Sequence, residues 1–127
     1  MRTEQEKVNI QKVSDFADKS LLIVDDDNPF RDRLARAMIK KGFEVNQAEG
    51  VKTGINAAKN MPPAFAVIDL RLGDGNGLEI VKEIKKLKKD SRIIMLTGYG
   101  NIPTTVAAVK AGAIDYIAKP VDADDVE

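Results

Sequence analysis

The sequence predicts a doubly wound α/β domain, in which helices cover both faces of a parallel sheet. Three short apolar runs, residues 21–24, 65–68 and 93–96, are continuous and bounded by polar residues, as in parallel strands buried on both faces. Segments of helical period separate them. Two weaker strand candidates, residues 43–48 and 115–118, complete an alternation of strand and helix that is typical of this fold class.

The first helix is expected directly after the strand at residues 21–24. Asn28 suits the N-cap and Pro29 suits the first helical position, where its missing N–H and fixed φ are tolerated. Apolar residues then recur on one face until Gly42 ends the helix. Three later segments repeat this period. The periodic residues are Phe30, Leu34, Ala37 and Met38, then Val51, Ile55 and Ala58, then Leu78, Val81 and Ile84, and finally Ile102, Val106 and Val109.

The length of 127 residues allows one domain with a hydrophobic core. We expect this domain to span residues 20–127. Residues 1–19 are polar and poor in aromatic side chains, so we expect a flexible tail. Residues 121–127 read as the first turn of a fifth helix that is cut short, and no further domain is expected in this chain.

Composition excludes several classes of function. Lys+Arg and Asp+Glu balance at 20 each, so the chain lacks the positive field that direct nucleic-acid binding uses. No apolar run approaches the roughly 18 residues of a membrane span, and no secretory signal is present, which favours a soluble, cytoplasmic protein. Without histidine or cysteine, Ser-His-Asp catalysis, zinc sites built on these residues and redox thiols are excluded.

Polar residues with shared chemistry follow the expected strands. Asp25 and Asp26 follow the first strand, Asp69 ends the third, Thr97 ends the fourth and Lys119 follows the fifth. In open parallel sheets, ligands bind beyond the carboxyl ends of the strands, so these side chains are expected at one edge. Clustered carboxylates suit Mg²⁺, and a carboxylate can accept a phosphoryl group as a nucleophile. The pattern predicts a magnesium-dependent phosphoryl site.

Each of these residues alone has a more ordinary explanation. A helix N-terminus favours negative charge nearby, which alone could explain Asp25, Asp26 and Asp27. Asp27 in particular is interpreted as a helix-entry residue. Thr97 could be a plain strand residue, Lys119 a surface charge, and the segment 73–77 (GDGNG) a turn, because it lacks the Lys-Ser/Thr of a phosphate-binding loop. The combination at the strand ends is what favours a site.

Four segments in this order, VDDD, IDLRLGDGNGLE, IIMLTGYG and DYIAKP, resemble the receiver domain of two-component response regulators. The resemblance covers the chain from Ser20 to its end. DLRLGDGNGLE and LTGYGNIPTTVAAVKAGA also resemble the RegA/PrrA/ActR type of redox-responsive regulator. The resemblance implies a flavodoxin-like sheet of five parallel strands in the order 2-1-3-4-5.

The resemblance also implies roles for individual residues around a bound Mg²⁺ ion. Asp69 would be the phosphoacceptor and a metal ligand. Asp26 would bind Mg²⁺ directly and Asp25 mainly through water, and the backbone carbonyl of Arg71 would complete the protein ligands.

Three further residues receive roles in the same way. Thr97 would hydrogen-bond the phosphoryl group, Lys119 would pair with it, and Tyr116 would be an aromatic rotamer switch, although partial core is an equally good reading of that tyrosine. The family has a cis peptide where this chain has Lys119-Pro120. Many receivers carry Met-Pro where this chain has Leu72-Gly73, so the loop after Asp69 is expected to be looser.

The resemblance implies a signalling switch and not an enzyme, with self-dephosphorylation as an auxiliary activity. A sensor histidine kinase would be the phosphoryl donor, and the signal would reach the face of the fourth helix and fifth strand, which could also form a homodimer. The domain that this switch would control, a DNA-binding output domain, is not in this chain.

Two other functions fit parts of the pattern. A Mg²⁺-dependent aspartyl-phosphate phosphohydrolase of the haloacid dehalogenase type needs D-x-D-x-T/V, but Asp25-x-Asp27 is followed by Pro29 at the last position. An FMN-binding electron carrier needs a Ser/Thr-rich loop after the first strand, but residues 25–29 read DDDNP, which repels phosphate unless a metal is bound.

Overall fold

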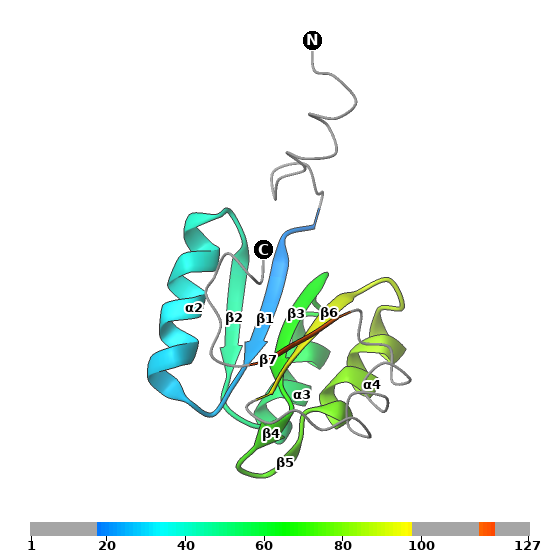
Figure 1. Ribbon diagram of the computed structural model, residues 1–127. Coiled ribbons are helices and arrows are strands. Elements are labelled where there is room, and N and C mark those ends of the chain that lie inside the picture. Colours follow the sequence, from blue (N-terminus) through cyan, green and yellow to red (C-terminus); the bar gives the residue numbers. More distant parts are fainter. Residues whose placement is uncertain (1–17, 98–114, 119–127) are drawn as a thin grey trace.

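The structure of the protein is a computed structural model that describes residues 18–97 and 115–118. Within these residues, five parallel strands form one sheet in the order β2-β1-β3-β6-β7 (Figure 1). When the five strands of this sheet are numbered by themselves along the chain, β6 is the fourth and β7 the fifth. The order is then 2-1-3-4-5, as the resemblance implies. The strands are β1 (Ser20–Val24), β2 (Glu44–Ala48), β3 (Phe65–Asp69), β6 (Arg92–Thr97) and β7 (Asp115–Ala118).

Among the described residues, three helices lie against this sheet. They are α2 (Asn28–Lys40), α3 (Val51–Asn60) and α4 (Leu78–Leu87), close to the segments that the apolar period predicts. Figure 1 shows α2 on one side of the sheet and α3 and α4 together on the other. The expected helix around residues 102–112, the fifth helix at residues 121–127 and most of the expected tail lie outside the described residues.

The N-cap of α2 is Asp27 and not Asn28, so that prediction was wrong by one residue. The Oδ1 atom of Asp27 accepts a hydrogen bond from the Phe30 N–H at 3.1 Å, and Asp27 has extended backbone angles. Either an aspartate or an asparagine can satisfy the free N–H groups of a first turn, and sequence alone does not separate two adjacent candidates. The reading of Asp27 as a helix-entry residue is confirmed.

The core has two layers because successive side chains of a strand alternate between the faces of the sheet. From β1, Leu22 and Val24 pack in the layer with α3 and α4. Leu21 and Ile23 pack in the layer with α2. All five residues of β1 are buried, which explains why a central strand reads as a continuous apolar run. No helix among the described residues is long and apolar enough to cross a membrane.

The described residues begin at Asp18, two positions before the expected start of the domain. Asp18 accepts hydrogen bonds from the backbone N–H of Ser20 at 3.0 Å and from its hydroxyl at 2.7 Å, and its Oδ2 lies 2.7 Å from Nζ of Lys88. The carbonyl of Lys19 accepts from the Glu44 N–H at 2.9 Å. Both residues were assigned to the tail. Lys19 makes one further hydrogen bond to β2 before β1 begins, and Asp18 contacts Lys88 at the end of α4.

We expect Asp18→Asn to lower the free energy of unfolding by only about 0.5 kcal/mol, because this ion pair is partly exposed to solvent. The hydrogen bond from Lys88 is the main cause that lowers the pKa of Asp18 from 3.8 to about 2. A lowered folded-state pKa stabilises the fold above the unfolded pKa, and this contribution is lost as pH falls from about 4 to about 2. Urea unfolding of both proteins across this range measures the difference; a difference that stays constant with pH would contradict the assignment.

Candidate functional site

The acidic turn after β1 is held by the end of the neighbouring strand. The backbone N–H of Asp25 donates to the carbonyl of Ala48, the last residue of β2, at 3.1 Å. The Asp25 side chain is fully buried, and its Oδ1 accepts from the Asp27 N–H at 2.9 Å. Asp26 between them is exposed. The turn therefore presents one buried and one exposed carboxylate at the carboxyl edge of the sheet.

Arg31 holds the acidic turn, residues 25–27, in place by hydrogen bonds, a role that was not predicted from the sequence. Its Nη1 donates to the backbone carbonyl of Asp25 at 2.7 Å, and its Nε donates to Oε1 of Gln47 in β2 at 3.0 Å. A cation so near the N-terminus of a helix is disfavoured by the helix dipole. That unfavourable position was a signal in the sequence that Arg31 makes specific contacts.

Asp69 completes the acidic group. It is the last residue of β3, its register partner in β6 is Leu96, and it is only 6% exposed. Its Oδ1 accepts from the Arg71 N–H at 3.3 Å. One carboxylate oxygen from each of Asp25, Asp26 and Asp69 lies within 4.8 Å of the others. The structure thus brings together the three carboxylates that the sequence places at two strand ends.

The chemistry of this donor set fits a divalent cation. Three carboxylates at this spacing repel one another, and a bound dication turns that repulsion into attraction. Hard cations such as Mg²⁺ and Ca²⁺ prefer carboxylate, carbonyl and water oxygens. Asp25, Asp26 and Asp69 are the residues that could hold such an ion.

Of the remaining predicted residues, Thr97 ends a strand at the same edge. Thr97 is the last residue of β6 and is in register with Ala118, the last residue of β7. Tyr116 lies within β7, and only the backbones of Thr97 and Tyr116 belong to the described structure. Lys119 lies outside the described residues. The roles assigned to these residues, and to the Arg71 carbonyl, stay predictions.

The segment after Asp69 forms a small hairpin, which confirms that GDGNG is a turn. Its strands are β4 (Arg71–Leu72) and β5 (Gly75–Asn76), at the same edge as the acidic group (Figure 1). Oδ1 of Asn76 accepts from the Leu78 N–H at 2.8 Å, at the start of α4. Asn76 thus joins the base of the hairpin to the start of α4, and the looseness of the loop stays a prediction.

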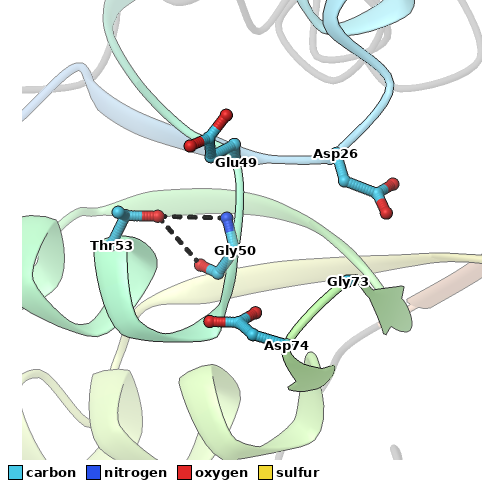
Figure 2. Close-up of a pocket in the computed structure, with 6 residues that line it drawn as sticks. All are labelled: Asp26, Glu49, Gly50, Thr53, Gly73 and Asp74. Carbon is cyan, nitrogen blue, oxygen red and sulfur yellow. Dashed lines mark hydrogen bonds between the residues drawn. The ribbon is translucent and has the colours of Figure 1, made fainter.

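A pocket of about 320 Å³ opens between the acidic turn, the start of α3 and this hairpin. Figure 2 shows Asp26 on one side of it, with Gly73 and Asp74 on the hairpin side. Six residues line the pocket: Asp26, Glu49, Gly50, Thr53, Gly73 and Asp74. Its three carboxylates give the approach to the acidic group a negative charge.

The order of the sheet and the acidic group at its edge define a class of protein. Residues 21–127 match the response regulator receiver domain, and the chain belongs to this family.

Two relatives show the type of regulator. The chain is 62% identical over 109 residues to the acid tolerance regulatory protein ActR of Sinorhizobium medicae, covering 86% of this chain and 56% of ActR. It is 57% identical over 110 residues to the photosynthetic apparatus regulatory protein RegA of Rhodobacter capsulatus, covering 87% of this chain and 60% of RegA. The predicted likeness to the RegA/PrrA/ActR type is confirmed, and the chain spans little more than half the length of these relatives.

A solved structure supports the fold and the kind of site. A response regulator protein from Burkholderia pseudomallei is 38% identical, with a TM-score of 0.81, and the match covers 86% of this chain and 64% of that protein. That crystal structure contains a phosphorylated aspartic acid, a calcium ion and citrate.

Proposed function

We propose that this receiver domain is a phosphorylation-controlled switch in which Asp69 accepts a phosphoryl group from a sensor histidine kinase in the cytoplasm. Mg²⁺ would be held by Asp25, Asp26 and Asp69, with the Arg71 carbonyl as a further ligand. The observation that carries the proposal is the convergence of three carboxylates within 4.8 Å at the carboxyl edge of a receiver sheet. The phosphorylated aspartic acid and metal ion of the Burkholderia protein support it.

The chemistry asks little of the protein beyond position and charge. A carboxylate oxygen of Asp69 attacks the phosphorus of a phosphohistidine, an O–P bond forms and the N–P bond breaks, and the departing imidazole keeps the electron pair. The Arg71 N–H orients the Asp69 carboxylate through its hydrogen bond to Oδ1. When bound, Mg²⁺ supplies positive charge for the phosphoryl oxygens.

The other site residues act on the acyl phosphate after transfer. Thr97 hydrogen-bonds the phosphoryl group and Lys119 pairs with its charge. Thr97 and Tyr116 then relay the change to the face formed by β7 and the helix expected around residues 102–112. Two copies associate as a homodimer through this face. Thr97 ends β6 beside β7, which carries Tyr116, so the relay crosses one pair of strands. Slow self-dephosphorylation resets the switch.

We further propose that the switch controls a DNA-binding output domain encoded outside this chain. ActR and RegA are regulatory proteins of which this chain spans 56% and 60%. The balanced charge of the chain itself supports no direct contact with nucleic acid.

Incubation with Mg²⁺ and acetyl phosphate, followed by intact mass measurement, tests the proposed function. We expect the mass of one phosphoryl group to be added, and addition to stop when a chelator removes the metal. Steady turnover of a phosphomonoester such as p-nitrophenyl phosphate, with no lasting adduct, would instead favour the phosphohydrolase. The absence of both adduct and turnover would contradict any phosphoryl chemistry at this site.

Asp26→Asn should stabilise the metal-free protein and destroy its response to Mg²⁺. Removing one of three adjacent carboxylates relieves repulsion, which should raise the free energy of unfolding by about 1 kcal/mol. In the wild-type protein, Mg²⁺ at about 100 times its dissociation constant should add about 2.7 kcal/mol. Thermal melts of both proteins with and without Mg²⁺ measure these effects. Equal Mg²⁺ shifts in the two proteins would show that Asp26 is not a ligand.

A further inference from the structure

The N-cap residue of helix α3 supplies no capping side chain. Its N-cap is Gly50, which has no side-chain acceptor for the free N–H groups of the first turn. The acceptor comes from Asp74 at the tip of the β4–β5 hairpin. Oδ1 of Asp74 accepts from the Val51 N–H at 2.7 Å, and Oδ2 accepts from the Lys52 N–H at 3.2 Å. A carboxylate more than twenty positions away in the sequence thus caps α3 (Figure 2).

The start of α3 is shaped to receive this carboxylate. A Cβ atom at Gly50 would lie 2.7 Å from Oδ1 of Asp74, so a larger residue there would push the carboxylate away. The hydrogen bonds from Val51 and Lys52 lower the pKa of Asp74, so the group is charged in the folded protein. A negative charge at a helix N-terminus is also favoured by the helix dipole.

Asp74 holds the segment that adjoins the phosphoacceptor. The hairpin begins two residues after Asp69, and its first residue, Arg71, donates its N–H to the Asp69 carboxylate at 3.3 Å. The base of the hairpin is tied to α4 through Asn76. Its tip is tied to α3 through Asp74. The tip of the hairpin is therefore held at the start of α3, and its base is held at the start of α4 and, through Leu70, beside β6.

We propose that Asp74 is a positioning residue for the phosphoryl site: by capping α3 it fixes the hairpin, and through Arg71 it fixes the Asp69 carboxylate and the carbonyl offered to the metal. This rests on the proposed function of Asp69. The hydrogen bonds of Asp74 restrain this glycine-containing loop, as a proline would restrain it by fixing φ. Asp74 is not one of the three carboxylates that converge within 4.8 Å.

Asp74→Ala tests the proposal through hydrogen exchange and Mg²⁺ binding. We expect amides of residues 71–77 to exchange faster, on the order of fivefold, because a lost cap frees the hairpin tip. We expect the Mg²⁺ dissociation constant, measured by calorimetry, to rise about tenfold, as for the loss of other supports of metal ligands. At saturating Mg²⁺ the rate of adduct formation from acetyl phosphate should return to within about twofold of wild type, because a bound ion would itself hold the Asp69 carboxylate that the hairpin no longer fixes. Asp74→Asn, which keeps one acceptor oxygen, should fall between the two proteins.

Two control variants separate positioning from charge and from helix stability. Glu49→Gln removes one negative charge from the same pocket and leaves the hydrogen bonds of Asp74 in place. Thr53→Ala weakens the start of α3, where the Thr53 hydroxyl accepts from the Gly50 N–H at 3.0 Å, without touching the hairpin. We expect both controls to bind Mg²⁺ within about twofold of wild type.

The proposal is overturned if Glu49→Gln raises the Mg²⁺ dissociation constant as much as Asp74→Ala, since charge alone would then explain the effect. An equal effect of Thr53→Ala would overturn it as well, by assigning the change to α3. Unchanged exchange of residues 71–77 in Asp74→Ala would show that the cap does not hold the hairpin. Exchange needs no phosphorylation, so a wild-type protein that forms no adduct would count against the proposed function and leave this arm of the test standing.

Discussion

Asp69→Asn should abolish the phosphoryl adduct and leave the fold intact. Asparagine has nearly the same shape as aspartate, but its amide lacks the negative charge that attacks phosphorus. We expect the rate of adduct formation from acetyl phosphate to fall by at least about 10³-fold. Intact mass measured at intervals after mixing gives this rate.

Asp32→Asn is the matched control for this loss, because Asp32 is an exposed carboxylate on α2. The control should form the adduct at the wild-type rate. Retention of the adduct in Asp69→Asn would assign the acceptor to another residue and contradict the proposed function.

Gly77→Ala should be among the most destabilising single substitutions in the described residues, with a loss of about 3 kcal/mol. Gly77 is the N-cap of α4 and its N–H donates to the Leu70 carbonyl at 2.8 Å. An added Cβ would overlap the backbone carbonyl oxygen of Asp69 and lie 2.8 Å from Cγ2 of Ile68. Both residues belong to β3, which is paired on both sides and cannot move away easily. Urea unfolding measures the loss.

Gly73→Ala, in the same hairpin, is the control for the general effect of replacing a glycine. The nearest atom to a Cβ at Gly73 is Oδ2 of Asp26, at 4.0 Å, so this substitution should change stability by no more than about 0.5 kcal/mol. Equal losses in the two variants would mean that the close approach of Gly77 to Asp69 is not what limits this position.

The sheet could be predicted from the sequence because its central strands are buried on both faces. The run LLIV in β1 supplies Leu21 and Ile23 to one core layer and Leu22 and Val24 to the other, so it has no polar position to interrupt it. The site could be predicted for a related reason. Residues that follow parallel strands meet at one edge, so Asp26 and Asp69 were placed together although 43 positions separate them (69 minus 26).

The contacts that position the site were harder to predict because they join segments through backbone groups. Nothing in the spacing of Asp74 shows that it caps a helix far away in the chain, and a glycine at an N-cap does not indicate which distant group will supply the acceptor. The N-cap of α2 was misassigned because Asp27 and Asn28 have similar capping chemistry. From the sequence, Gly77 looks like an ordinary turn glycine. Only the structure shows that the carbonyl of Asp69 leaves no room for a side chain at this position.

The residue that carries the phosphoryl group can be located directly in the wild-type protein. After incubation with Mg²⁺ and acetyl phosphate, borohydride reduction converts an aspartyl phosphate to homoserine, which peptide mass spectrometry places in the sequence. We predict homoserine at position 69 alone, and none when Mg²⁺ is chelated. Homoserine at position 25 or 26, or a phosphoryl group on a hydroxyl side chain, would contradict the assignment of Asp69 as the acceptor.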